Sequence, residues 1–252
     1  MKIVVAVKHV PDVQSDRRLE DGVLVRGEED VLNELDENAV EAAVTLAEEL
    51  DGQVVALTMG PADAEDGLRR ALQMGADSGV LVTDEALEGA DVPTTARVLA
   101  AAVKQIGDVD LVVTGMSALD SMTSMLPGAL ATALQVPALT LASRLEVADG
   151  TVTVTRTLGT VTETLAAPLP ALVSVTDQAN EPRYPNFAAM RAAKKKPVEE
   201  WGLADLGLEA HAPAVAVVEA QARPARETGT IITDAGQAGA QLAAWLVDKQ
   251  LV

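Results

Sequence analysis

The segment from Gly115 to Ser124 contains the residues whose types and spacing best suit a chemical task, the binding of a phosphate group. Its glycine permits close approach of the backbone, and four of its side chains carry hydroxyl groups: Ser117, Ser121, Thr123 and Ser124. A helix is expected to begin directly after the segment, and the free N–H groups at a helix N-terminus favour an anion. A plain connection between a strand and a helix would have a similar composition, so the sequence leaves both interpretations open.

Other polar residues have simpler explanations. Asp12, Asp120 and Asp177 could each act as an acid or a base, but a single aspartate after a strand more often caps a helix or forms a turn, and we favour capping. His9 stands alone after a strand and is interpreted as a polar surface residue. The three lysines at 194–196 would oppose the negative end of a helix dipole. The sequence alone does not decide between that role and a binding role.

The composition excludes several classes of protein. The chain of 252 residues has no cysteine, which rules out disulfides and thiolate chemistry, and its two histidines are too few for a histidine metal cluster. A formal charge of −19 opposes binding to nucleic acid. Motifs of dinucleotide-binding, P-loop, zinc protease and serine hydrolase sites are missing. No apolar run approaches the roughly 20 residues that cross a bilayer, and the first residues do not form a secretory signal. We therefore expect a cytoplasmic protein without membrane insertion.

Strands and helices are predicted to alternate through the first half of the chain. Apolar runs typical of buried strands are each followed by the periodicity of an amphipathic helix. The predicted strands are 2–8, 53–58, 79–83 and 110–114, and the predicted helices are 33–50, 62–74, 93–106 and one that ends near 134. This alternation predicts an α/β fold with a doubly wound, mostly parallel sheet. Ligands of such sheets bind beyond the carboxyl ends of the strands, here after Lys8, Met59 and Gly115.

The pattern changes after Ala138. Alternating segments across two turns predict an antiparallel extension, over 139–147, 151–158 and 161–167. An apolar strand at 172–176 precedes the segment 178–196, which holds two prolines and the densest cluster of cations, and a helix is expected to start near Asn186. We place a nucleotide-binding domain at 1–190 and a C-terminal arm at 191–252, with a final helix around 238–247. Such an arm cannot form a large core of its own, so we expect it to pack on another surface.

Six blocks of the sequence together resemble one known family. They are VVAVKHVPD at 4–12, LNELDENAVEAA at 32–43, LTMGP at 57–61, ALQMGAD at 71–77, GMSALD at 115–120 and NEPRYPNFAAMRAAKKK at 180–196. In order and spacing, from residue 1 to about 208, they resemble the β (small) subunit of electron transfer flavoproteins, and the last block is the most specific. The resemblance implies an adenine-nucleotide-binding, hydrolase-like fold and an αβ heterodimer in which the arm packs on the α subunit.

The resemblance implies that the α subunit holds most of the redox FAD and that the β subunit buries one structural AMP. An aromatic content of 2% agrees, because few side chains are available to enclose a flavin ring. Carried onto this sequence, the AMP site draws on four segments, and its phosphate meets backbone N–H groups and hydroxyls at the helix start. The site residues are Ala6, Lys8, Asn33, Glu34, Leu35, Asp36, Met59, Val113, Thr114, Gly115, Met116, Ser117, Ala118, Leu119, Asp120, Ser121, Met122, Thr123 and Ser124.

Some positions depart from the family pattern. Many members have a G-x-Q-A-x-D loop with a further Gln and Gly, where this chain has Ser117, Ser124 and Leu126. Val13 stands where some members place a Tyr near the flavin, and Thr157 stands where some place an acidic residue that pairs with an α-subunit Arg. The contacts with phosphate and flavin are therefore expected to differ in detail.

The resemblance also implies a function, which is electron transfer from flavoprotein dehydrogenases, such as those for acyl-CoA, to a quinone oxidoreductase, without catalysis by this chain itself. The segment 178–196 would dock the dehydrogenase, with Phe187 as the anchor. The implied partner-binding residues are Glu181, Arg183, Tyr184, Phe187, Met190 and Arg191.

Three alternatives stay open: an electron-bifurcating paralogue with a second FAD in place of AMP, a stress-type nucleotide-binding module, and an adenylating enzyme, which would need a Gly- and Ser-rich loop where this chain has KHVPD.

Overall fold

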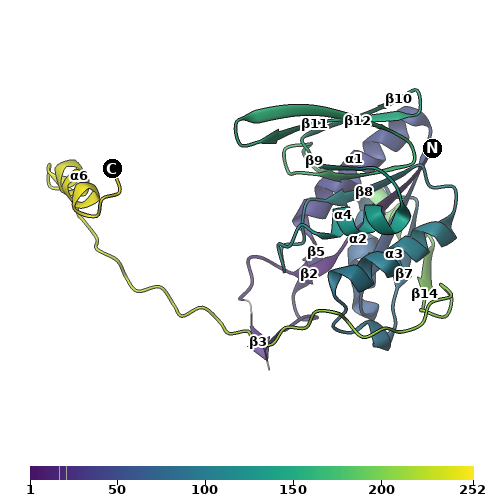
Figure 1. The fold of residues 1–252 in the computed structure, drawn as a ribbon, viewed down its shortest axis with the longest axis horizontal. Coiled ribbons are helices and arrows are strands. Elements are labelled where there is room, and N and C mark those ends of the chain that lie inside the picture. Colours follow the sequence, from purple (N-terminus) through teal and green to yellow (C-terminus); the bar gives the residue numbers. More distant parts are fainter. Residues whose placement is uncertain (17, 21) are drawn as a thin grey trace. The chain divides into compact units, whose positions relative to one another are not determined.

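A seven-stranded parallel sheet organises the fold (Figure 1). It is seen in a computed structural model that describes residues 1–16, 18–20 and 22–252. The strand order is β14-β7-β6-β1-β8-β13-β9, and every neighbouring pair is parallel. The strands are β1 (Lys2–Ala6), β6 (Gln53–Met59), β7 (Ser78–Val82), β8 (Leu111–Gly115), β9 (Ala138–Ala142), β13 (Ala171–Val175) and β14 (Val198–Trp201). The predicted doubly wound parallel sheet is confirmed.

Helices cover both faces of this sheet, which explains why its strands are apolar at consecutive positions. On β1, Ile3 and Val5 pack in the cluster that contains the buried side chains of α1 (Glu34–Leu50) and α2 (Glu65–Met74). Val4 packs in a second cluster, with the buried side chains of α3 (Val92–Ile106) and α4 (Leu126–Leu134). Alternate residues of one strand therefore bury against different helix layers. Two short 3-10 turns, Ala62–Ala64 and Glu85–Leu87, precede α2 and α3.

The predicted antiparallel extension is confirmed, but its first strand begins later in the chain than we predicted. Three strands form it: β10 (Arg144–Ala148), β11 (Thr151–Leu158) and β12 (Val161–Pro168). The prediction of one antiparallel strand over 139–147 is wrong, because residues 138–142 form β9 at the edge of the parallel sheet. The chain changes sheets at Ser143, whose N–H donates to the Thr155 carbonyl at 2.8 Å. An alternating apolar pattern does not distinguish two short strands from one longer strand.

Short elements that the sequence did not predict lie between β1 and α1. They are β2 (His9–Pro11), which pairs with β5 (Asp30–Leu32), and β3 (Leu19–Glu20), which pairs with β4 (Val23–Leu24). Both pairs are antiparallel. The pairing of β2 with β5 brings Leu32, just before α1, beside His9, just after the central strand β1.

The chain divides into two compact units, Met1–Ala220 and Gln221–Val252. The first unit includes α5 (Phe187–Ala193) and β14, which joins the sheet beside β7 although no strand was predicted there. The second unit contains α6 (Ala238–Asp248). The structured first unit thus continues beyond residue 190, where we had predicted the arm to begin. Across the described part of the chain, no helix combines the length and apolar character needed to cross a membrane.

Candidate functional site

The chain reverses its winding direction between β1 and β8, the two central neighbours of the sheet. The helix that follows β1 packs on one face, in the cluster with Ile3, and the helix that follows β8 packs on the other, in the cluster with Val4. The connections after these two strands therefore diverge at the carboxyl edge. Such a divergence is where open α/β sheets bind ligands, and most of the predicted nucleotide site lies there.

Asn33, which is fully buried, ties the two diverging connections together. Its side-chain N–H donates to the Ser117 carbonyl at 2.9 Å, and its side-chain oxygen accepts from the Leu119 N–H at 3.0 Å. Its own N–H donates to the Lys8 carbonyl at 2.9 Å. The side chain of Asn33 thus holds the loop after β8, as donor and as acceptor, while its backbone N–H holds the end of β1.

Asp36 is a buried carboxyl group in the first turn of α1. One oxygen accepts from the Lys8 N–H at 2.9 Å. Burial raises the pKa of Asp36 to about 7, although hydrogen bonds from Asn33, Lys8 and Gly115 favour its charged form and limit the rise. The carboxyl group is therefore held close to its titration point at neutral pH, between the two connections that Asn33 joins.

We expect the stability contributed by Asp36 to fall as the pH rises from 3.8 to about 7. In the folded protein Asp36 keeps its proton up to a pKa of about 7, whereas in the unfolded chain it ionises near its ordinary value of 3.8. The folded state therefore binds the extra proton between these values, so stability falls with rising pH through that window and levels off above it, by at most about 1.4 kcal/mol per pH unit. In the Asp36→Asn variant, the thermal midpoint plotted against pH should be flatter. Equal slopes in both proteins would contradict this assignment.

Asp120 is an ion-paired residue and not a helix cap, so the predicted capping role is wrong for it. Its side chain has no exposed surface, and one oxygen accepts from Lys8 Nζ at 2.7 Å and from the guanidinium of Arg26. Burial favours the neutral acid, but the hydrogen bonds and charges of Lys8 and Arg26 outweigh it and lower the pKa of Asp120. Asp12 does not cap a helix either: it forms a turn, the other role considered, and accepts from the Gln14 N–H at 2.8 Å.

Two buried side-chain atoms in the described residues have no hydrogen-bond partner, and both belong to this edge of the sheet. They are Oδ1 of Asp120 and Oγ1 of Thr58, near the end of β6. Burying a polar atom without a partner is costly. A ligand that brings hydroxyl or amino groups to this edge could satisfy them, so their chemistry fits the ribose and adenine of a nucleotide.

The loop after β8 is held at its base and exposed at its tip. Ser117 is buried, and its hydroxyl oxygen accepts from the Ser124 N–H at 3.3 Å. Met122 and Ser124 adopt left-handed backbone angles, with φ of 51° and 52°. Three of the four hydroxyl residues named for phosphate binding are exposed, at 121, 123 and 124. They can reach a phosphate from solvent, while Ser117 shapes the loop.

The remaining predicted site residues surround the same edge. Ala6, Val113 and Thr114 are buried in the central strands, and Met59 ends β6. Gly115 has Leu35 and Asp36 directly against it, since a β-carbon added there would lie 2.7 Å from the Leu35 carbonyl oxygen. Glu34 is exposed at the start of α1, while Met116, Ala118 and Leu119 are partly buried in the loop. The structure thus brings the four predicted segments together.

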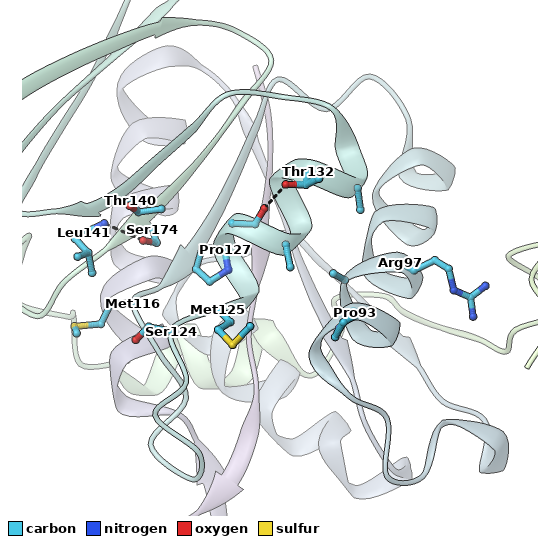
Figure 2. A pocket seen from close by; sticks show the side chains of 14 residues that line it. Pro93, Arg97, Met116, Ser124, Met125, Pro127, Thr132, Thr140, Leu141 and Ser174 are labelled. Atoms are coloured by element: carbon cyan, nitrogen blue, oxygen red, sulfur yellow. Dashed lines mark hydrogen bonds between the residues drawn. The ribbon is translucent and has the colours of Figure 1, made fainter. Parts of the chain in front are cut away.

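A cavity of about 670 Å³ lies beside this loop, on the face that α3 and α4 cover (Figure 2). Met116 and Ser124 line it, so it adjoins the predicted site. Its other lining residues were not predicted: Pro93, Ala96, Arg97, Met125, Pro127, Gly128, Ala129, Thr132, Ala133, Thr140, Leu141 and Ser174. Leu141 has a φ of 62° and donates its N–H to the Ser174 hydroxyl at 2.9 Å. No sequence signal indicates a left-handed leucine, so this wall could not have been predicted.

Comparison with known proteins identifies the family. Residues 21–206 match the electron transfer flavoprotein domain. The β subunits of the electron transfer flavoproteins of Mycobacterium tuberculosis and Mycobacterium leprae are 37% and 38% identical to this chain, over 99% of it and 99% of their own length. The chain belongs to the electron transfer flavoprotein β subunit family. Another relative, the caffeyl-CoA reductase-Etf complex subunit CarD of Acetobacterium woodii, is 34% identical over 99% of this chain and 97% of its own.

In this family member the predicted docking segment, residues 178–196, exposes its large apolar side chains to solvent. Asn186 caps α5, accepting from the Ala189 N–H at 2.9 Å, so the helix begins where it was predicted. Phe187 is 78% exposed and Tyr184 is 87% exposed, and Met190 is also exposed. Glu181 and Arg191 are exposed, whereas Arg183 is partly buried.

Lys196 does not act on the helix that precedes it. Its ammonium group donates to three carbonyl oxygens at the end of α2, those of residues 72, 75 and 76, at 2.5–3.2 Å. Burial lowers the pKa of Lys196. Of the two interpretations that the sequence left open for the three lysines, a role at the end of their own helix does not hold for Lys196, because Lys196 caps α2 and fastens the end of the predicted docking segment to it.

Proposed function

We propose that this family member is the β subunit of a heterodimeric electron transfer flavoprotein, which accepts electrons from flavoprotein dehydrogenases, such as those for acyl-CoA, and delivers them to a quinone oxidoreductase in the cytoplasm. The observation that carries the proposal is the full-length similarity to relatives named electron transfer flavoprotein subunit beta, which extends over 99% of both chains. The chain is an electron carrier subunit without a catalytic residue of its own. Its partner is an α subunit, on which residues 221–252 would pack.

We further propose that AMP binds at the carboxyl edge of β1 and β8 and that FAD is held mainly by the α subunit. The flavin supplies the redox chemistry when it is bound. What supports AMP is the set of groups at this edge: the unpartnered oxygens of Asp120 and Thr58 for ribose or adenine, and the exposed hydroxyls at 121, 123 and 124 for phosphate. Lys8 and Arg26 add positive charge beside an anionic ligand.

Phe187 and its neighbours would dock the dehydrogenase. An exposed aromatic side chain at the start of a short helix, with Arg191 and lysines beside it, suits a partner whose surface has an apolar pocket with an acidic rim. The prolines at 182 and 185 limit the backbone freedom of the segment before it binds.

An electron-bifurcating protein with a second FAD in place of AMP is the alternative that a specific observation favours. CarD, a relative at 34% identity, is named as part of a caffeyl-CoA reductase-Etf complex. The cavity of about 670 Å³ next to Met116 and Ser124 adds space that a ligand larger than AMP could use. The two alternatives predict different ligands in this chain, AMP or FAD, so an analysis of the bound nucleotide distinguishes them.

The experiment is to purify the chain alone and with its α subunit and to analyse the nucleotides. We expect the isolated chain to be colourless, because an aromatic content of 2% offers few side chains to enclose a flavin ring, and the heterodimer to be yellow, with AMP released by acid and separated by chromatography. A full equivalent of FAD in the isolated chain would favour the bifurcating alternative. Recovery of ATP alone, without flavin in either preparation, would favour a stress-type nucleotide-binding module.

A further inference from the structure

We propose that Arg183 is a positioning residue that holds the docking segment in the conformation in which Phe187 can engage the dehydrogenase. The inference rests on the docking role proposed above and adds the residues that prepare the segment for binding. It assigns Glu41 and Glu48 of α1 to the same task.

Arg183 is bound to α1 through every part of its guanidinium group. Nε and Nη2 donate to the two oxygens of Glu41 at 2.8 and 3.1 Å. Nη1 and Nη2 donate to the two oxygens of Glu48 at 2.6 and 3.1 Å. The Arg183 N–H donates to Glu41 as well, at 3.0 Å. Both contacts are bidentate, the geometry in which an arginine fixes a direction as well as a distance.

The two carboxylates are well placed for this task because they lie on one face of a regular helix. Glu48 follows Glu41 by seven positions, which is about two turns of helix, so both side chains point the same way. The contacts lower the pKa of both carboxyl groups, with hydrogen bonds from Arg183 outweighing the burial of Glu41. At neutral pH the pair is fully charged, and the arginine is held between them.

Other contacts fasten the two ends of the segment. At its start, Asn38 and Asn180 donate to each other's backbone carbonyls, both at 3.0 Å. At its end, Lys196 caps α2, and Ala193 is buried in the core. Residues 180–186 have neither helix nor strand structure between these ends. Arg183 thus binds the middle of this irregular stretch to α1.

The exposed side chains project from the stretch that Arg183 fixes. The Tyr184 ring lies under the guanidinium of Arg70, whose carbon is 5.4 Å from the ring centre, and Arg70 in turn donates to Glu37 of α1 at 2.9 Å. Phe187 follows on the first residue of α5. Because Arg183 is occupied by two carboxylates of its own chain, its expected contribution is to prepare the segment rather than to attract a partner. Preparation of this kind lowers the ordering cost of binding.

The test uses the intact heterodimer and the dehydrogenase that reduces it, with the heterodimer concentration varied. The Arg183→Gln variant should raise the KM for the heterodimer roughly three- to ten-fold, as expected when a segment must order on binding, and leave kcat and the flavin content unchanged. Arg183→Lys, which keeps the charge but lacks the bidentate geometry, should recover only part of the loss. Arg144→Gln, which removes an exposed charge elsewhere, is the matched control and should behave like the parent.

A second variant separates positioning from a direct contact. Glu48→Gln alters α1 and not the docking segment, yet it should raise the KM in the same direction. Combining it with Arg183→Gln should add little, since residues in one network are not additive. Faster hydrogen exchange of the amides of residues 184–190 should accompany each variant.

The outcomes distinguish this inference from the docking proposal. An unchanged KM in Arg183→Gln, together with a raised KM in Phe187→Ala, would overturn the positioning role and leave docking intact. An unchanged KM in both variants would overturn docking, and the inference with it. Should Arg183→Gln melt early or lose flavin, the milder Glu48→Gln variant decides: an unchanged KM there overturns the inference.

Discussion

Replacement of Gly115 by alanine is expected to prevent assembly of the heterodimer with its nucleotide. A β-carbon at this position would lie 2.4 Å from a carboxyl oxygen of Asp36 and 2.7 Å from the carbonyl oxygen of Leu35. The second atom belongs to the backbone at the start of α1, so it cannot move without shifting that helix. The cost should therefore reach or exceed the roughly 1–3 kcal/mol typical of overpacking. The yield of heterodimer on size exclusion and its AMP content measure the effect.

Gly128→Ala is the matched control for this change. Gly128 lies within α4, and apart from its chain neighbours and the nearby backbone of that helix, no atom comes within 4 Å of a β-carbon added there. Alanine in a helix is favoured over glycine by about 0.5–1 kcal/mol, so the control should assemble as well as the parent. A Gly115→Ala protein that assembles normally and retains AMP would show that α1 and the loop after β8 are not in close contact, contrary to the site described here.

Phe187→Ala is expected to weaken electron transfer from the dehydrogenase by roughly ten-fold or more while leaving flavin content and thermal stability almost unchanged. The side chain is 78% exposed, so its removal opens no cavity. A buried aromatic anchor at an interface costs about 2 kcal/mol or more when it is truncated, and 1.4 kcal/mol corresponds to a factor of ten. Steady-state transfer, with the heterodimer concentration varied, measures the effect.

Val161→Ala provides a comparison at an exposed apolar residue outside the docking segment, on β12. It should alter neither transfer nor melting. Should Phe187→Ala instead melt markedly earlier or lose FAD while its affinity for the dehydrogenase is retained, Phe187 would be a structural residue and the docking assignment would fail.

Most of the secondary structure could be predicted from the sequence because its signals are local. Buried parallel strands require consecutive apolar residues, since Ile3 and Val4 face opposite helix layers, and that run is visible in the sequence. Helix ends are also local: Asn186 caps α5 as the pattern indicated. The prediction of the strands was wrong where one local pattern suits two different structures. Residues 138–147 have an alternating pattern that suits one strand, and only the pairing of β9 with β13 divides them.

The polar contacts of the site were the least predictable part. Asp120 was expected to cap a helix, but Lys8 and Arg26, 112 and 94 residues away, pair with it. For Lys196 the sequence left open a role at the end of its own helix, but its ammonium group binds carbonyl oxygens at the end of α2. A carboxylate or an ammonium group has several suitable partners in any sequence, and its choice depends on which of them the fold brings within hydrogen-bonding distance.

The sequence by itself determined the family and the layered α/β architecture, and it indicated the segments proposed for nucleotide binding and docking, because these depend on residue types, order and local periodicity. Only the tertiary structure decided how those segments are joined: Asn33 between the two loops, Asp36 buried against Lys8, and Arg183 between two turns of α1. The physical reason is that apolar burial tolerates many neighbours and leaves a local pattern of residue types in the sequence, as helix capping does. A buried polar group instead needs one specific partner, which the fold brings to it from residues far apart in the sequence.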